Sequence, residues 1–124
     1  MRPSISSMHP RPPNYIPVVR EADDLLLREW LLVLRGDGRS PNTIEKYRET
    51  ISQLAAFLAK GGFPLITNVT AEHLREWLNE LRGRGNKPAT VNTHYRSASS
   101  FFNWLVTEGE IQTNPLSRIE PPRA

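Results

Sequence analysis

Cations and small hydrogen-bonding side chains gather on one face of each of two segments, residues 41–60 and 88–108. If each segment is a helix, with 100° of rotation per residue, these side chains lie opposite the apolar stripe of the segment or at the start of the segment. In and just before the first segment they are Arg39, Asn42, Thr43, Lys46 and Gln53, and one carboxylate, Glu49, lies on the same face. In and just before the second they are Lys87, Thr90, Thr93, Arg96, Ser97, Ser100 and Asn103. Most of these residue types bind phosphate oxygens or base edges, and amide N–H groups at a helix start add affinity for anions.

The two faces also have a plainer interpretation, which the sequence leaves open. They are equally compatible with solvated helix surfaces, because polar side chains are mostly exposed in any soluble protein. Ser97 and Ser100 are also compatible with a close contact between helices. The segment between the two faces differs, since Glu72 and Glu80 point outward and carboxylates repel DNA. That segment is therefore not expected to face a nucleic acid.

Residues that could carry catalysis or hold a metal do not occur at the necessary spacing. The chain has no cysteine, and His9, His73 and His94 form no H-x-x-x-H or similar ligand pair. There is no G-x-S-x-G motif and no phosphate-cradling glycine loop. We therefore expect no catalytic residue, no metal site and no cofactor, and the chain is not expected to be an enzyme.

Length and composition narrow the class of protein further. A chain of 124 residues suits one small domain with tails. The 16 Lys and Arg exceed the 13 Asp and Glu only slightly, which permits nucleic-acid binding without indicating it. Apolar runs such as Leu31 to Leu34 are far below the ~20 residues of a membrane span, and no secretory signal is visible. Together with the absence of cysteine, this favours a cytoplasmic protein.

Caps and glycine turns predict four helices, with no stretch that alternates like a strand. The first is expected over residues 22–35. Ser40 followed by Pro41 starts the second, Thr70 caps the third, and Pro88 starts the fourth. Each helix carries an apolar stripe at helical spacing and ends in a turn that contains glycine. The expected fold is all-α, a small four-helix bundle.

The two ends of the chain differ from this helical region. Residues 1–19 hold five of the 11 prolines and no periodic apolar pattern, so we expect a flexible, disordered arm. The helical domain is expected to span residues 20–119. Residues 120–124, which include Pro121 and Pro122, should form the start of a linker.

The order of the segments resembles a known family. The most telling parts are the S-P-x-T-[IV]-x-x-Y-R start at Ser40, the aromatic pair before LVTEG, and the exit NPLSRIEPPR. Over about residues 20–123 the chain is similar to the N-terminal core-binding domain of tyrosine recombinases. This family includes phage integrases and Xer-type recombinases, and the fold of the domain is called SAM-like.

The resemblance implies a four-helix bundle that clamps double-stranded DNA opposite a C-terminal catalytic domain, with other recombinase protomers on the same site. It also implies that the second and fourth helices face the DNA. The DNA-binding residues carried over from the two motifs are Arg39, Asn42, Thr43, Lys46, Lys87, Thr90, Thr93 and Arg96. Lys87 departs from the pattern, because the family often has a capping Ser or Thr there. The wide apolar surface of the first helix is a candidate contact with the catalytic domain or a neighbouring protomer.

The resemblance places the catalytic set outside this chain. In the family it comprises arginines, a lysine, an H-x-x-R element and a nucleophilic tyrosine, all in the domain that would follow. Three residues after His73 and His94 stand Glu76 and Ser97, so neither histidine starts an H-x-x-R, and Tyr47 and Tyr95 are expected to line the core. The chain is therefore predicted to serve DNA integration and recombination by binding DNA, without cleaving or joining it. The alternatives are a helical protein-interaction module without a DNA role and, more remotely, a small helical enzyme.

Overall fold

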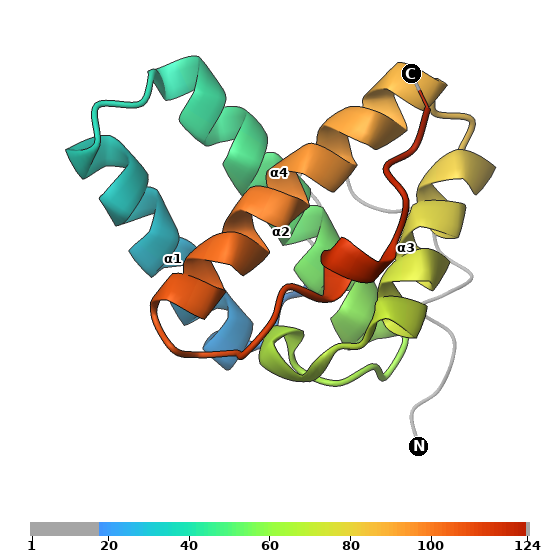
Figure 1. Ribbon diagram of the computed structural model, residues 1–124, viewed down its shortest axis with the longest axis horizontal. Coiled ribbons are helices and arrows are strands. Elements are labelled where there is room, and N and C mark those ends of the chain that lie inside the picture. The colour runs from blue at the N-terminus through green and yellow to red at the C-terminus, as the bar shows by residue number, and fades with distance from the viewer. Residues whose placement is uncertain (1–17, 124) are drawn as a thin grey trace.

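Four long helices build the fold: α1 (Glu21–Gly36), α2 (Pro41–Lys60), α3 (Ala71–Gly83) and α4 (Pro88–Thr107) (Figure 1). Two short 3-10 turns, η2 (Ile66–Asn68) and η3 (Pro115–Arg118), lie in the connections. The structure is a computed structural model that describes residues 18–123, and no strand occurs in that range. The predicted all-α bundle is confirmed. Of the predicted arm, residues 1–17 lie outside the described residues.

The helix starts follow the predicted caps. The hydroxyl of Ser40 accepts a hydrogen bond from the N–H of Thr43 at 3.2 Å. Thr70 caps α3 in the same way, and the Nδ1 atom of His73 accepts from the N–H of Thr70 at 3.0 Å, which completes a capping box with histidine as its second member. Lys87 provides no side-chain cap, so α4 begins on Pro88 with its first amides free of a side-chain partner.

The core forms where the apolar stripes of the four helices meet. Trp77, Phe101 and Phe102 are its largest fully buried side chains, surrounded by leucines and isoleucines from every helix. The ring of Trp30 on α1 lies against that of Phe101 on α4, with centroids 5.1 Å apart. Because α1 and α4 both pack on α2, the direction of α2 is fixed from two sides.

The helices α2 and α4 cross, and from the crossing their N-terminal halves diverge toward opposite upper corners of the view in Figure 1. Near the crossing, the hydroxyl of Thr50 lies 2.8 Å from the Nδ1 atom of His94. Thr50 is buried and His94 is half-buried, so this hydrogen bond joins the two helices inside the structure. The polar faces of the two helices are thereby held in one arrangement.

The C-terminal tail is fastened to α4 beyond the last long helix. The hydroxyl of Tyr95 donates to the carbonyls of Leu116 and Ile119, at 3.2 and 2.9 Å. The side-chain amide of Asn114 donates to Ser99 and to Asn103 on the same helix. Tyr95 is buried as predicted, and burial raises the pKa of its hydroxyl. The packed structure therefore continues through Ile119.

The start of α1 is fastened to the loop between α2 and α3. Asp23 is 1% exposed, and its Oδ1 atom accepts from the N–H of Ile66 at 3.0 Å. The guanidinium of Arg20 donates to the carbonyls of Phe63 and Pro64 and lies 3.8 Å from Asp23. Burial raises the pKa of Asp23, while the N–H of Ile66 and the charge of Arg20 act in the opposite direction.

Candidate nucleic-acid interface

A hollow of about 290 Å³ lies between α2 and α4. Its lining consists of five hydroxyl-bearing residues and two cations, with no carboxylate among them. The residues are Thr43, Lys46 and Tyr47 of α2 and Thr93, Arg96, Ser97 and Ser100 of α4. Hydroxyls and cations both donate hydrogen bonds to anionic oxygens, so this lining suits an anion better than a cation.

Helical spacing explains why these residues share the hollow. On α2, Lys46 and Tyr47 stand three and four residues after Thr43. On α4, the other three lining residues stand three, four and seven residues after Thr93. Such residues form a single stripe along a helix. Because α2 and α4 pack against each other, the two stripes face one space.

The structure brings together four of the eight predicted DNA-binding residues: Thr43, Lys46, Thr93 and Arg96. Arg39 lies outside this group and lines a neighbouring hollow of about 350 Å³ with residues that include Arg35 and Arg48. The other three predicted residues are exposed in the first turns of α2 and α4 or just before them and line neither hollow. They are Asn42, Lys87 and Thr90.

The cations of the predicted face differ from most other arginines in their partners. Within residues 18–123, Arg39, Lys46, Lys87 and Arg96 form no salt bridge. By contrast, four exposed arginines elsewhere pair with a carboxylate three or four residues away in sequence, namely Arg28, Arg48, Arg75 and Arg84, while Arg35, Arg82, Arg118 and Arg123 form no salt bridge in that range either. The charges of the α2–α4 face therefore remain available for an external anion.

Three lining residues, Tyr47, Ser97 and Ser100, were not among the predicted site residues. Tyr47 was expected in the core, and the structure shows it half-buried, with its ring stacked on Trp30, and also lining the hollow. Each of the three stands four residues after a predicted site residue. That spacing places them near the polar faces, but only the crossing of the helices shows that they line one space.

The burial of His94, which contacts Thr50 beneath this face, should make stability depend on pH. Burial lowers the pKa of His94; the nearby carboxylate of Glu49 raises it in part, and the charge of Arg84 lowers it further. The unfolded chain therefore binds the proton more readily, so stability falls as pH drops below about 6.5, the usual histidine pKa. We expect a lower free energy of unfolding at pH 5.5 than at pH 7.5, measured by urea denaturation. In His94→Gln this pH dependence should be weaker, and an unchanged dependence would contradict the assignment to His94.

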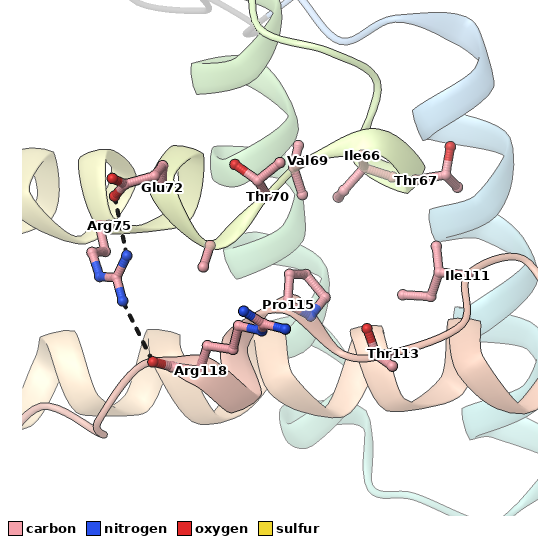
Figure 2. A pocket seen from close by; sticks show the side chains of 11 residues that line it. Ile66, Thr67, Val69, Thr70, Glu72, Arg75, Ile111, Thr113, Pro115 and Arg118 are labelled. Carbon is pink, nitrogen blue, oxygen red and sulfur yellow. Dashed lines mark hydrogen bonds and ion pairs between the residues drawn. The ribbon is translucent and has the colours of Figure 1, made fainter.

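A second hollow, of about 440 Å³, lies between the start of α3 and the C-terminal tail (Figure 2). Figure 2 shows Glu72 bound to Arg75, which also donates to the carbonyl of Arg118. Ile111 and Pro115 contribute apolar surface to it. This hollow holds none of the eight predicted residues, and it contains a carboxylate, so it is a poorer match for a phosphate backbone.

No group of three or more histidine, aspartate or glutamate side chains within residues 18–123 is placed to hold a metal ion. None of the helices in that range combines the length and the apolar character that crossing a membrane requires.

Comparisons with known proteins point to one family. The model of the phage integrase N-terminal SAM-like domain matches residues 27–109. Among solved structures, the integrase from mycobacterium phage Brujita is similar, with a TM-score of 0.70 and 25% sequence identity. The similarity covers 80% of this chain but only 32% of that integrase, so the chain matches about a third of its length. Comparison with curated protein sequences gives no match.

Proposed function

The chain belongs to the phage integrase N-terminal SAM-like domain family, and we propose that it binds duplex DNA with the α2–α4 face as one half of a clamp. The family is that of the N-terminal domain of integrases and not of their catalytic domain. Membership of this family indicates a part in DNA integration and site-specific recombination. That the chain binds DNA with the α2–α4 face goes beyond what membership of the family indicates.

One observation carries the proposal: the hollow between α2 and α4 gathers unpaired cations and hydroxyls and no carboxylate. The backbone of DNA is a line of phosphates, and contacts to it come mostly from Arg, Lys, Ser, Thr and Tyr side chains and from helix N-termini. The N-terminal ends of α2 and α4 diverge to opposite sides of the molecule in Figure 1, so each adds a positive dipole end at its own edge of the face.

The second half of the clamp would be a catalytic domain connected through residues 120–124. The similar integrase is about three times as long as the part that matches, which leaves room for such a domain. The tail is fastened through Ile119 by Tyr95, so a linker would begin after that point. In Figure 1 the end of the chain lies near the N-terminal end of α4, so a following domain would start beside the proposed DNA-binding face. Other protomers would bind the same DNA site.

The proposal predicts strong salt dependence of DNA binding. If Arg39, Lys46, Lys87 and Arg96 each neutralise one phosphate, the logarithm of the association constant should fall with the logarithm of the salt concentration with a slope of about −3.6. Affinity would then fall about 100-fold between 50 and 200 mM salt. Fluorescence anisotropy of a labelled 20-base-pair duplex measures this slope. A chain that shows no binding at 50 mM salt would contradict the proposal.

A protein-interaction module is the second candidate, favoured by the outer face of α1. Leu25 and Leu32 are 54% and 63% exposed, and they stand seven residues apart, so they lie on one stripe. Such a stripe suits contact with the catalytic domain or another protomer. If protein interaction were the sole function, the wild-type chain would not bind DNA, and substitutions in this stripe would abolish partner binding.

A further inference from the structure

Ser97 has an unusual position on α4. It is 4% exposed, it lines the α2–α4 hollow, and its hydroxyl forms no hydrogen bond with any residue that the structure describes. Two threonines on the same helix show the usual alternative, since Thr93 and Thr107 donate to carbonyls four residues earlier. The Ser97 oxygen is also not one of the fully enclosed side-chain atoms that lack a partner, so it keeps access to the hollow and is available to a ligand there.

Tyr47 presents a second available hydroxyl from the opposite wall. Its ring is stacked on Trp30, with centroids 5.0 Å apart and planes inclined by 19°, so its direction is fixed before any ligand arrives. Its hydroxyl forms no hydrogen bond among residues 18–123, whereas that of Tyr95 donates to two carbonyls. A fixed donor loses little conformational freedom when it binds.

The rest of the lining suits an anion with several acceptor oxygens. Lys46 and Arg96 are exposed at the hollow, one from each helix. The hydroxyl of Thr43 accepts a hydrogen bond from Ser40, which leaves its own proton free to donate. Since a phosphodiester has only acceptors for hydrogen bonds and carries one negative charge, it matches a set of donors without a carboxylate.

We propose that the α2–α4 hollow is the seat of one DNA backbone phosphate, whose oxygens accept hydrogen bonds from the hydroxyls of Ser97 and Tyr47. Lys46 neutralises its charge, and Arg96, on the facing helix, neutralises the neighbouring phosphate of the same DNA. This inference rests on the proposed DNA-binding function and adds two neutral donors to the cations. The donors position the phosphate, and through it the DNA, at a single point between the two helices.

The test removes single hydroxyls and measures DNA binding by the 124-residue chain. Ser97→Ala and Tyr47→Phe each delete one oxygen and leave the carbon framework, including the ring stacked on Trp30. Each should weaken binding of a 20-base-pair duplex about tenfold, because hydrogen bonds to charged groups are the stronger ones. The salt slope should stay unchanged in both, since neither change alters the number of neutralised phosphates. Lys46→Gln should instead reduce that slope by about 0.9.

The matched control is Ser52→Ala on α2, which removes a half-buried hydroxyl outside the hollow and should leave affinity unchanged. Urea denaturation of every variant identifies any that do not fold, and Tyr47→Phe alone decides the test if Ser97→Ala is one of them. Salt-dependent binding that is equal in wild type, Ser97→Ala and Tyr47→Phe would overturn the phosphate seat and leave the proposed function standing. Absence of DNA binding by the wild-type chain would overturn both.

Discussion

Replacing Lys46 and Arg96 together with glutamate should weaken duplex DNA binding by about 100-fold or more at 0.1 M salt. Each change substitutes repulsion for attraction at the same hollow, and a loss of about 1.4 kcal/mol at each position is tenfold in affinity. The slope of affinity against salt should also become shallower by about 1.8, since two neutralised phosphates are lost. Anisotropy titrations of a labelled duplex at three salt concentrations measure both quantities.

The control for this prediction is a charge reversal on the same helix. Lys60 is exposed at the C-terminal end of α2, and Lys60→Glu changes the net charge as much as Lys46→Glu does. If position matters, Lys46→Glu alone should weaken binding about tenfold and Lys60→Glu much less. Equal effects of the two single variants would show that DNA responds to net charge only, and the assignment of the binding face would be wrong.

The parts of this fold that were predictable from sequence depend on neighbours along the chain. Ser40 and Thr70 cap their helices because a cap contacts the amide three residues later, which the sequence displays directly. The polar faces of α2 and α4 follow in the same way from a fixed rotation per residue. For this reason Thr43, Lys46, Thr93 and Arg96 could be placed on the correct faces without a structure.

The parts that were not predictable depend on how helices meet. Ser97 and Tyr47 line the hollow only because α2 and α4 cross there, and no local pattern gives the position of that crossing. The fastening of the tail by Tyr95 joins residues more than 20 positions apart. Asp23, in the first turn of α1, binds the N–H of Ile66, 43 residues away. Contacts of this range follow from tertiary packing and not from local propensity.

Asp23→Ala should therefore lower the free energy of unfolding by about 2–3 kcal/mol, a large share of the stability of a small domain. The substitution leaves the N–H of Ile66 without its partner in a buried place, and it removes the carboxylate beside Arg20. Asp23→Asn should lose less, because its amide oxygen can still accept from Ile66 and a neutral group is easier to bury. Urea denaturation at pH 7 compares the three chains.

The adjacent Asp24 provides the matched control. Asp24 stands in the same first turn of α1 and forms an ion pair with Arg28, which is largely exposed. Loss of an exposed pair costs at most about 1 kcal/mol, and both aspartates interact with the same helix dipole. If the loop contact is what matters, Asp24→Ala should be much milder than Asp23→Ala. Equal losses would reduce the role of Asp23 to its charge at the helix end, and the fastening of α1 to the loop before α3 would contribute little to stability.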